Sequence, residues 1–302
     1  MGTNPLVSVI VPNFNHAKFL RDRFNSILNQ TFQDFELIIL DDCSTDDSRK
    51  ILESFKNNSK VSHLELSLSN SGSPFKQWAK GVNLAIGDYI WIAESDDYCD
   101  KEFLQILIQK LLQYKDLKIA YSGINWVDEN GATLRDLSVN NSSYLRNGDI
   151  ELKNRISLFN SIQNVSAVVF ERATLLNFIS RIENYKYCGD WILYAYILST
   201  ECKILFESQK LTSYRYYHNN LSHNDYFFSK CIVEGVDVLG IVKDNNNLSD
   251  FKRQFILRHW LKKVVSNYHC LTIKDYVDIN IKLFKFSPFT YLYHFLRIWR
   301  IW

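Results

Sequence analysis

The chain has 302 residues, of which 46% are hydrophobic and 23% charged, and its formal net charge is +2. This balance is typical of a globular protein and excludes a disordered chain, which would be less hydrophobic and more highly charged. Ten glycines and four prolines exclude a collagen-like or linker-rich protein, and the length predicts one large domain or two smaller ones.

Strand-like and helix-like segments alternate over the first hundred residues. Short apolar runs rich in β-branched residues predict strands at 6–11, 35–40, 61–66 and 88–93. Apolar residues at helical spacing predict helices at 18–29, 46–57, 76–86 and 101–114. Pro12 is expected to end the first strand, because proline has no N–H to donate to a neighbouring strand. This order predicts an α/β protein with an open, mixed, largely parallel sheet flanked by helices.

The pattern becomes mixed after residue 115. It predicts a helix at 191–199 and strands at 118–122, 165–170 and 211–217. Residues 128–154 are rich in Asn, Ser, Asp and Gly, which predicts a loop. Helix-like segments then dominate, at 226–243, 250–267, 273–285 and 288–301. The sequence therefore predicts a helical C-terminal region over 224–302.

Charge is unevenly distributed between these parts of the chain. Residues 251–302 contain ten Lys and Arg against two Asp, a net charge of +8, which leaves −6 for residues 1–250. A basic end is typical of proteins that bind nucleic acid or an anionic membrane. We expect a membrane surface and no nucleic acid, because residues 281–302 combine basic with aromatic side chains. The alternative is that this segment packs on the rest of the protein.

The cysteines and the N-terminus bear on the compartment. The six cysteines form no Cys-x-x-Cys pair and show no spacing typical of a zinc site. A chain of this length needs no disulfide framework, so we expect reduced thiols in a cytoplasmic protein. We expect neither a signal peptide nor a transmembrane helix, because no apolar run reaches 18 residues and the first residues carry no basic region.

Polar clusters follow three of the predicted strands. They are Pro12-Asn13-Phe14-Asn15, Asp41-Asp42-Cys43-Ser44 and Glu94-Ser95-Asp96-Asp97. Ligands of open α/β sheets bind beyond the carboxyl ends of the strands, so the clusters predict a ligand site there. Adjacent carboxylates also suit Mg²⁺ or Mn²⁺, which often bridges carboxylates and substrate phosphates. The plainer alternative is that each cluster only forms the turn after its strand.

Residues 7–48 resemble the opening of family 2 glycosyltransferases. The likeness is carried, in the family's order, by Pro12-Asn13-Phe14-Asn15, Asn29-Gln30-Thr31-Phe32 and Asp41-Asp42-Cys43-Ser44-Thr45-Asp46. It continues with Asn70-Ser71-Gly72, Gly87-Asp88-Tyr89-Ile90 and Ser95-Asp96-Asp97. The resemblance implies a GT-A fold, a nucleoside-diphosphate sugar as donor (a UDP-sugar is favoured), and inverting transfer to an acceptor hydroxyl. It also implies a divalent cation, Mn²⁺ or Mg²⁺.

The resemblance also implies site residues. The residues that would bind the nucleotide sugar are Pro12, Asn13, Asn15, Asp41, Asp42, Ser44, Gly72, Lys80, Glu94, Ser95, Asp96, Arg215 and His218. Asp96 matches the second acid of the family's Asp-x-Asp motif, and Asp96 and Asp97 would hold the metal. Glu94 replaces the first Asp of that motif, and its longer side chain leaves its role open. Arg215 and His218 would contact the diphosphate, or only end a solvated strand.

The segment Gly189-Asp190-Trp191 resembles the part of the family that supplies the general base, with Gly in place of the first acid. Asp190 would then take the proton of the acceptor hydroxyl. A helix N-terminus would lower the pKa of Asp190 and keep it ionised. The alternatives are that Asp190 only caps the helix, and that Trp191 packs in the core and does not stack on a sugar.

This interpretation divides the chain into functional domains. Residues 1–223 would be the glycosyltransferase domain, with a nucleotide-binding half over 1–100 and an acceptor half over 101–223. The region 224–302 would bring the protein to the cytoplasmic face of a membrane, where a saccharide or lipid-linked acceptor of bacterial polysaccharide synthesis is found. The rival is a non-catalytic sugar-nucleotide-binding or membrane scaffold protein, which the departures at Glu94 and Gly189 favour. Dehydrogenases and P-loop enzymes are disfavoured, because their glycine-rich motifs are missing.

Overall fold

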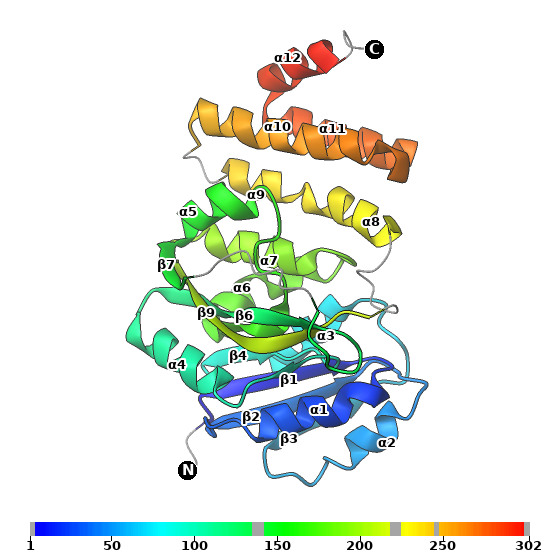
Figure 1. The fold of residues 1–302 in the computed structure, drawn as a ribbon, viewed down its shortest axis with the longest axis vertical. Coiled ribbons are helices and arrows are strands. Elements are labelled where there is room, and N and C mark those ends of the chain that lie inside the picture. Colours follow the sequence, from blue (N-terminus) through cyan, green and yellow to red (C-terminus); the bar gives the residue numbers. More distant parts are fainter. Residues whose placement is uncertain (1–3, 135–141, 218–224, 245–247, 299–302) are drawn as a thin grey trace. The chain divides into compact units, whose positions relative to one another are not determined.

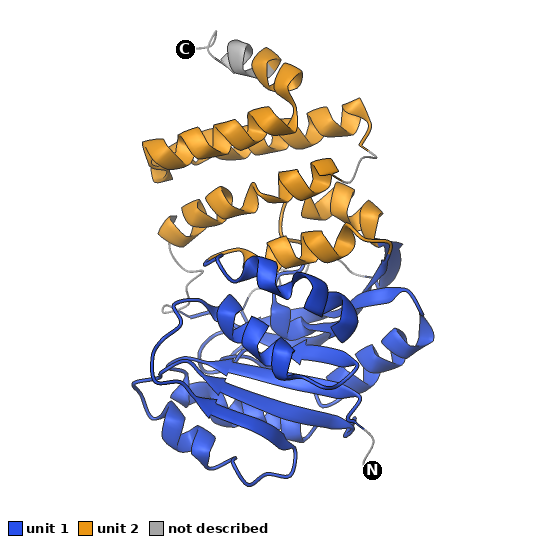
Figure 2. Cartoon of the chain, turned by 180° about the vertical axis from the view of Figure 1, so that it is seen from behind, with its two compact units in different colours: residues 1–147, 162–186, 202–218 blue, residues 148–161, 187–201, 219–302 orange. Residues whose placement is uncertain are grey.

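Figure 1 shows the computed structural model of the chain, which describes residues 4–134, 142–217, 225–244 and 248–298. The chain forms two compact units that interleave along the sequence (Figure 2). The first unit comprises residues 1–147, 162–186 and 202–218, and the second comprises residues 148–161, 187–201 and 219–302. A functional boundary after residue 223 stays a prediction.

A nine-stranded sheet forms the centre of the first unit. Its strands are β1 (Val7–Asn13), β2 (Phe35–Asp41), β3 (Val61–Leu66), β4 (Tyr89–Ile92), β5 (Tyr98–Cys99), β6 (Leu117–Val127), β7 (Tyr144–Asn147), β8 (Val168–Glu171) and β9 (Lys203–Arg215). They lie in the order β3-β2-β1-β4-β8-β6-β9-β5, and β7 pairs with β9. Strands β3, β2, β1 and β4 are parallel, and β8 between β4 and β6 is antiparallel to both. The predicted α/β architecture is confirmed.

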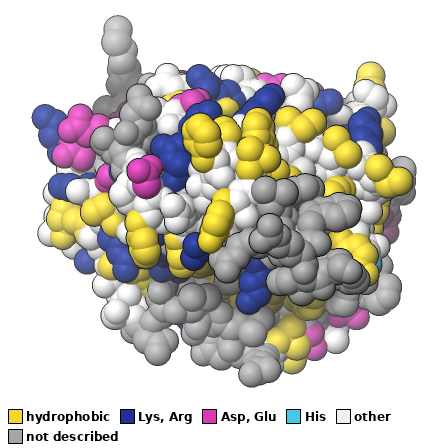
Figure 3. Space-filling model, turned by 90° about the horizontal axis from the view of Figure 1, so that it is seen from above, with side chains coloured by type: hydrophobic (Ala, Val, Ile, Leu, Met, Phe, Trp, Pro, Cys, Tyr) yellow, Lys and Arg dark blue, Asp and Glu magenta, His cyan; other side chains and the backbone are white. Residues whose placement is uncertain are grey.

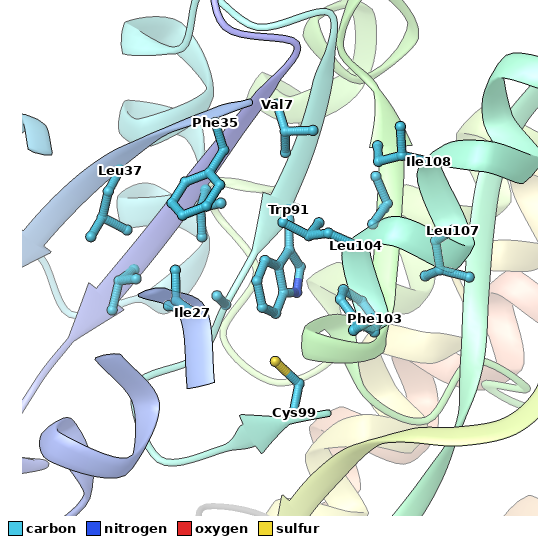
Figure 4. Close-up of a cluster of buried hydrophobic side chains, with 14 of the residues drawn as sticks. Val7, Ile27, Phe35, Leu37, Trp91, Cys99, Phe103, Leu104, Leu107 and Ile108 are labelled. Atoms are coloured by element: carbon cyan, nitrogen blue, oxygen red, sulfur yellow. The ribbon is translucent and has the colours of Figure 1, made fainter. Parts of the chain in front are cut away.

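Helices cover both faces of this sheet. They are α1 (Ala17–Leu28), α2 (Ser48–Glu53), α3 (Pro74–Leu84), α4 (Phe103–Gln113) and α6 (Arg172–Phe178), with 3₁₀ turns η2 (Val165–Ala167) and η3 (Ile179–Ile182). Side chains alternate between the faces of a strand, so β1 directs Val7, Val9 and Val11 to one side. These valines join α1 and α4 in one hydrophobic cluster, in which Phe103 and Leu104 lie on the same side of the Trp91 ring (Figure 4). On the other face Ile10 meets Gly81 of α3.

The second unit is helical. Its elements are α5 (Gly148–Glu151), a π-helical turn η1 (Leu152–Ile156), α7 (Gly189–Leu198), α8 (Asp225–Gly235), α9 (Val238–Asp244), α10 (Asp250–Ser266), η5 (Tyr268–Cys270), α11 (Ile273–Phe286) and α12 (Pro288–Ile298). Trp191 of α7 is buried against Trp260 of α10, with ring centroids 5.7 Å apart, so Trp191 packs in the core. None of the helices in the described part of the chain is long and apolar enough to cross a bilayer.

Several predicted boundaries were wrong. Pro12 lies inside β1 and not after it, because β4 ends at Ile92 opposite Ile10 and leaves that side of Pro12 without a partner strand. The predicted loop at 128–154 contains β7 and α5, and the predicted helix at 226–243 is two helices that break between Gly235 and Val238. The predicted strand at 211–217 begins upstream at Lys203. All six cysteines lie in the described part of the chain, and none of them forms a disulfide.

Gly87 joins α3 to β4 at a point where the backbone passes close to β1. A Cβ atom added there would lie 2.7 Å from the backbone N of Ser8 and from the carbonyl carbon of Val7. The backbone N–H of Gly87 also donates to the hydroxyl of Ser8, which in turn donates to buried Glu36. The approach therefore has no room for a side chain.

We predict that Gly87→Ala lowers the free energy of unfolding by about 1–3 kcal/mol, because β1 must move to admit the methyl group. Gly240→Ala in α9 is the matched control, because nothing lies within 4 Å of its added Cβ. That change should be neutral or stabilise by up to about 1 kcal/mol. Urea denaturation measures both, and equal effects of the two substitutions would contradict the prediction.

Candidate functional site

The carboxyl ends of β1 and β2 hold the first polar group of the candidate site. Asn13 and Asp41 are register partners, and the Asn13 Nδ2 donates to Asp41 Oδ1 at 2.8 Å and to Ser44 Oγ at 3.1 Å. The hydroxyl and the backbone N–H of Ser44 both donate to the Asp41 carboxylate, at 2.5 and 3.0 Å. Arg49 Nε lies 3.5 Å from the same carboxylate. Asp41 is thus fully buried and satisfied by protein donors.

Two turns with positive φ shape this end of the sheet. Asn15 has φ 56° and Cys43 has φ 64°, a left-handed conformation that few residues other than glycine adopt. The turns hold each other, because Asn15 N–H donates to Ser44 Oγ at 2.9 Å and Asn15 Oδ1 accepts from Thr45 N–H at 2.7 Å. Backbone strain of this kind costs of order 1–3 kcal/mol and is concentrated at functional sites.

Asp42 points away from Asp41, toward the start of α3. Its carboxylate accepts from the backbone N–H and hydroxyl of Ser71, both at 2.8 Å, and from Gln77 Nε2 at 2.7 Å. Gly72 follows with φ 75°, and nothing lies within 4 Å of the position of a Cβ there. Asp42 therefore fixes the loop before α3. Binding of the nucleotide sugar by Asp41 or Asp42 stays a prediction.

The end of β4 holds the second polar group. Trp78 Nε1 donates to Glu94 Oε1 at 2.6 Å, which ties this carboxylate to α3. Burial, followed by the charge of Asp96, raises the pKa of Glu94 to about 8. Asp97 is buried, and its oxygens accept from Asn164 Nδ2 at 2.9 Å and from the backbone N–H of Arg215 at 3.1 Å. Burial and Asp96 raise the pKa of Asp97 to about 7.

Asp96 is half-buried between these two acids. One of its oxygens accepts from the hydroxyl of Tyr217 at 3.2 Å. The ring of His16 lies next to this pair, with Nε2 3.3 Å from the Tyr217 hydroxyl and Nδ1 2.8 Å from Ser95 Oγ. Ser95 is fully buried, so His16 is fixed at both ring nitrogens.

The segment from Asn13 to His16 therefore connects the two polar groups. Asn13 is hydrogen-bonded to Asp41, and the backbone N–H of Asn15 is hydrogen-bonded to Ser44. His16 is hydrogen-bonded to Ser95 and to Tyr217, whose hydroxyl donates to Asp96. The structure brings the predicted residues of β1, β2 and β4 together at one edge of the sheet, as expected for the carboxyl ends of parallel strands.

The acids at the end of β4 fit a divalent cation that is shared with a ligand. Among the described residues no three His, Cys, Asp or Glu side chains form a preformed cage. Mg²⁺ and Mn²⁺ often need less, because they bind one or two carboxylates together with substrate phosphates and water. Asp96 suits this role best, since both oxygens of Asp97 already accept hydrogen bonds and Glu94 is bonded to Trp78. The mutual repulsion that raises the pKa of Glu94 and Asp97 would be relieved by a cation.

Other predicted residues have different surroundings. Arg215 Nη2 forms an ion pair with Asp22 at 2.5 Å, and its guanidinium lies between the rings of Phe19 and Tyr98. Lys80 forms an ion pair with Glu65 of β3. These contacts place neither cation on the acids at the end of β4, and phosphate binding by either stays a prediction. His218 lies outside the described residues.

Asp190 belongs to the second unit, in the first turn of α7. Its carboxylate accepts from Asn160 Nδ2 at 2.7 Å. Burial raises the pKa of Asp190 to about 6, although bonds from the Trp191 backbone and Asn160 oppose this effect. The expectation that the helix N-terminus would lower this pKa was wrong, because removal from water outweighs the dipole of the helix.

Sequence reasoning missed several residues of the site. His16, Gln77 and Tyr217 adjoin predicted motifs, and proximity to those motifs is the one signal that could have found them. Arg23 gave no such signal, because its position on the buried stripe of α1 predicts an apolar residue. It is fully buried, donates through Nε to the carbonyl of Glu94 at 2.9 Å, and lies 5.1 Å from the Trp91 ring. Within the described part of the chain, its Nη1 and Nη2 have no hydrogen-bond partner.

The charge of Arg23 lowers the pKa of both Glu94 and Asp97. We predict that Arg23→Met lowers the free energy of unfolding by about 3–5 kcal/mol, because it leaves buried carboxylates without a counter-charge. The loss should be larger at pH 9 than at pH 6. At pH 6 the raised pKa values keep Glu94 and Asp97 mainly protonated, whereas at pH 9 both groups are ionised and are stabilised by the charge of Arg23. Chemical denaturation at both pH values measures this difference.

The control for this prediction is Arg21→Met, which removes the same charge from the exposed side of α1. It should change the stability by no more than about 0.5 kcal/mol at either pH. A loss for Arg23→Met that does not depend on pH would show that Arg23 acts by packing and not through its charge.

Comparisons with known proteins agree with this geometry. The family model described as glycosyl transferase family 2 matches residues 8–162, which is just over half of the chain. The poly(ribitol-phosphate) beta-N-acetylglucosaminyltransferase TarS of Staphylococcus aureus is 41% identical over 102 residues, 32% of this chain and 17% of TarS. The glycosyltransferase GlyG of Streptococcus pneumoniae is 25% identical over 308 residues, 92% of this chain and 95% of GlyG.

Solved structures show the same fold. A crystal structure of residues 1–349 of S. aureus TarS with UDP has a TM-score of 0.69 and 20% identity, over 93% of this chain and 81% of that chain. The mannosyltransferase PcManGT of Pyrobaculum calidifontis, in complex with GDP-Man and Mn²⁺, has a TM-score of 0.57 and 12% identity, over 95% of this chain and 82% of that one. From the match of the family model and the arrangement of the sheet, the chain belongs to glycosyl transferase family 2 and is a glycosyltransferase with a GT-A-like fold.

Proposed function

We propose that the protein transfers a sugar, with inversion at the anomeric carbon, from a nucleoside-diphosphate sugar to a hydroxyl of a saccharide or lipid-linked acceptor. The observation that carries the proposal is the connection of the Asn13–Asp41 group to Asp96 through Asn15, His16 and Tyr217. This connection joins the polar residues that we propose for nucleotide binding to Asp96, the carboxylate that we propose for the cation.

A UDP-sugar is the favoured donor. TarS has been crystallised with UDP and with UDP-GlcNAc, whereas PcManGT holds GDP-Man. TarS is named for transfer to poly(ribitol-phosphate), and TuaG of Bacillus subtilis is named as a putative teichuronic acid biosynthesis glycosyltransferase, which points to bacterial surface polysaccharides as the setting. This chain spans 17% of TarS and 51% of TuaG. We place the protein on the cytoplasmic face of the membrane, with attachment through the basic C-terminal residues 281–302.

The chain's own residues divide the work of the reaction. Asn13, Asn15 and Ser44 shape the turn that would receive the nucleotide, and Asp42 fixes the loop that contains Gly72. Asp96 would hold Mn²⁺ or Mg²⁺, whose bound charge would offset the negative charge that develops on the leaving diphosphate. Asp190 would accept the proton of the acceptor hydroxyl, for which it must be ionised.

The test of this function is binding of UDP with and without Mn²⁺, measured by thermal shift and calorimetry, together with turnover of a panel of nucleotide sugars. We expect Mn²⁺-dependent stabilisation by UDP, because a ligand that binds only the folded state raises its stability. Asp96→Asn should remove the Mn²⁺-dependent part and lower turnover by about 100-fold or more. Asp88→Asn, an exposed acid at the opposite end of β4, is the control and should match the wild type. Absence of both UDP binding and turnover in the wild type would refute the proposal.

The pH dependence tests Asp190 separately. We predict that kcat/KM rises through an acid limb near pH 6, because Asp190 works as a base only when ionised and its pKa is about 6. Asn160→Ala should move this limb to higher pH, since it removes a donor that favours the ionised carboxylate. Asp190→Asn should lower kcat by about 10²–10⁴-fold.

The neighbouring change Ser161→Ala is the matched control for Asn160→Ala, because the Ser161 hydroxyl donates to Glu151 and not to Asp190. It should leave the acid limb in place. A limb that stays at the same pH in Asn160→Ala, or an Asp190→Asn variant as active as the wild type, would remove Asp190 as the base and leave the donor site untouched.

A further inference from the structure

A pocket of about 390 Å³ opens in the second unit, within its helical C-terminal part. Its walls come from the end of α9, the start of α10 and the junction of α11 with α12. Two cations and one acid line it, Lys243, Arg253 and Asp250. The predicted donor and acceptor roles use none of these residues.

The two cations are held in place at the junction. Lys243 Nζ donates to the carbonyl of Lys285 at 2.8 Å, and Arg253 Nη1 donates to the carbonyl of Phe286 at 3.3 Å. Both carbonyls belong to the C-terminal end of α11, where cations are favoured by the helix dipole. An ammonium has three donors and a guanidinium five, so the bonds to these carbonyls leave N–H groups of Lys243 and Arg253 for a further acceptor.

The first turn of α12 forms the facing wall. Ser287, Pro288, Phe289 and Thr290 line the pocket there, at the end of the helix where backbone N–H groups lack acceptors within the helix. An N-terminal turn of this kind favours negative charge. Lys243 and Arg253 against Asp250 give the pocket a net charge of +1. This charge matches a singly charged phosphodiester better than a dianionic phosphate.

Large aromatic side chains are exposed at and beside this pocket. Phe289 lines the pocket and is 90% exposed, and Phe251, next to Asp250, is 81% exposed. Figure 3, seen from above, shows hydrophobic side chains next to Lys and Arg side chains on one face of the molecule. Aromatic residues beside basic ones are typical of proteins that lie at a bilayer interface, where the rings enter the boundary between headgroups and acyl chains. A soluble phosphate would gain nothing from exposed phenyl rings.

We propose that this pocket binds the phosphodiester of an anionic phospholipid, with Lys243, Arg253 and the first turn of α12 around the phosphate and Phe289 and Phe251 in the bilayer surface. The inference rests on the proposed attachment to the membrane and names the site that carries it. It also agrees with the net charge of +8 over residues 251–302.

The test is flotation of the full chain with vesicles of phosphatidylcholine alone and of phosphatidylcholine with 30% phosphatidylglycerol. The wild type should float with the anionic vesicles only. The double variant Lys243→Gln/Arg253→Gln should bind them at least about tenfold more weakly, because each basic residue near an anionic surface contributes about 1 kcal/mol. Lys262→Gln/Lys274→Gln is the matched control, with the same change in charge at exposed positions away from the pocket. It should bind less than about threefold more weakly.

A second pair of variants guards against loss of folding. Phe289→Ser removes an exposed ring, and Ile273→Ser removes an equally exposed side chain at the other end of α11. Phe289→Ser should weaken binding by about tenfold, because a phenyl ring buried in the bilayer surface is lost, and Ile273→Ser should not. Turnover without vesicles should be unchanged in all four variants, which separates this test from that of the donor site.

Each result bears on the proposal. A wild type that ignores anionic vesicles would overturn both the attachment and the pocket. A wild type that floats while Lys243→Gln/Arg253→Gln and Phe289→Ser float equally well would overturn the pocket alone. Inorganic phosphate at millimolar concentration that displaces the wild type from the vesicles completely, with no effect of Phe289→Ser, would show an anion site without a lipid.

Discussion

The constraint on which the structure depends is the burial of acidic side chains at the ends of β2 and β4. A buried carboxylate is stable only if donors or a positive charge replace the water it loses. Asp41 accepts hydrogen bonds from Asn13 and Ser44. Asp42 accepts them from Ser71 and Gln77, and Glu94 accepts one from Trp78. Asp97 accepts hydrogen bonds from the side chain of Asn164 and from the backbone N–H of Arg215.

These donors come from different elements, so the acids hold the first unit together at the edge where the ligand is expected. The donors of Asp41 come from β1 and the turn after β2, those of Asp42 from the loop before α3 and from α3 itself, and those of Asp97 from the turn before β8 and the end of β9. A change in any one element is therefore transmitted to a carboxylate. Asp96 differs from buried Asp97, because it is half-buried and accepts a hydrogen bond from one hydroxyl, that of Tyr217.

The sequence predicted the parts of this arrangement that depend on local pattern. Strand β3 has the predicted bounds, and β2 differs by one residue, because each is a short apolar run between turn residues. The polar clusters were placed correctly at the strand ends, since the order of strands and helices alone puts those ends on one edge. The GT-A fold and the enzyme class followed from motifs in the family's order.

Features that depend on contacts between distant residues were not predictable. The tie from Trp78 to Glu94 joins α3 to the end of β4, and only the packed sheet brings the two together. Arg23 is a charged residue among the apolar buried residues of α1, and the helical pattern predicts neither its burial nor its role as a counter-charge. The bounds around 128–154 and 203–217 failed because β7 is stabilised by its pairing with β9 and not by a strong strand pattern of its own.

The case of Asp190 shows how burial changes the chemistry that a motif implies. A carboxylate with a low pKa is always ionised at neutral pH but is a weak base. A catalytic base works best when its pKa lies near the working pH. Burial in the second unit raises the pKa of Asp190 to about 6, while Asn160 and the backbone at the start of α7 keep it from rising further.

The same surroundings act in the opposite direction on a cation. Lys263 lies 5.1 Å from the ring of Trp191 and 4.9 Å from that of Trp260, and burial lowers its pKa. Burial around α7 thus destabilises the charged forms of both Asp190 and Lys263. The pKa values of Asp190 and Lys263 are therefore set by their burial in the folded second unit, which a local sequence motif does not reveal.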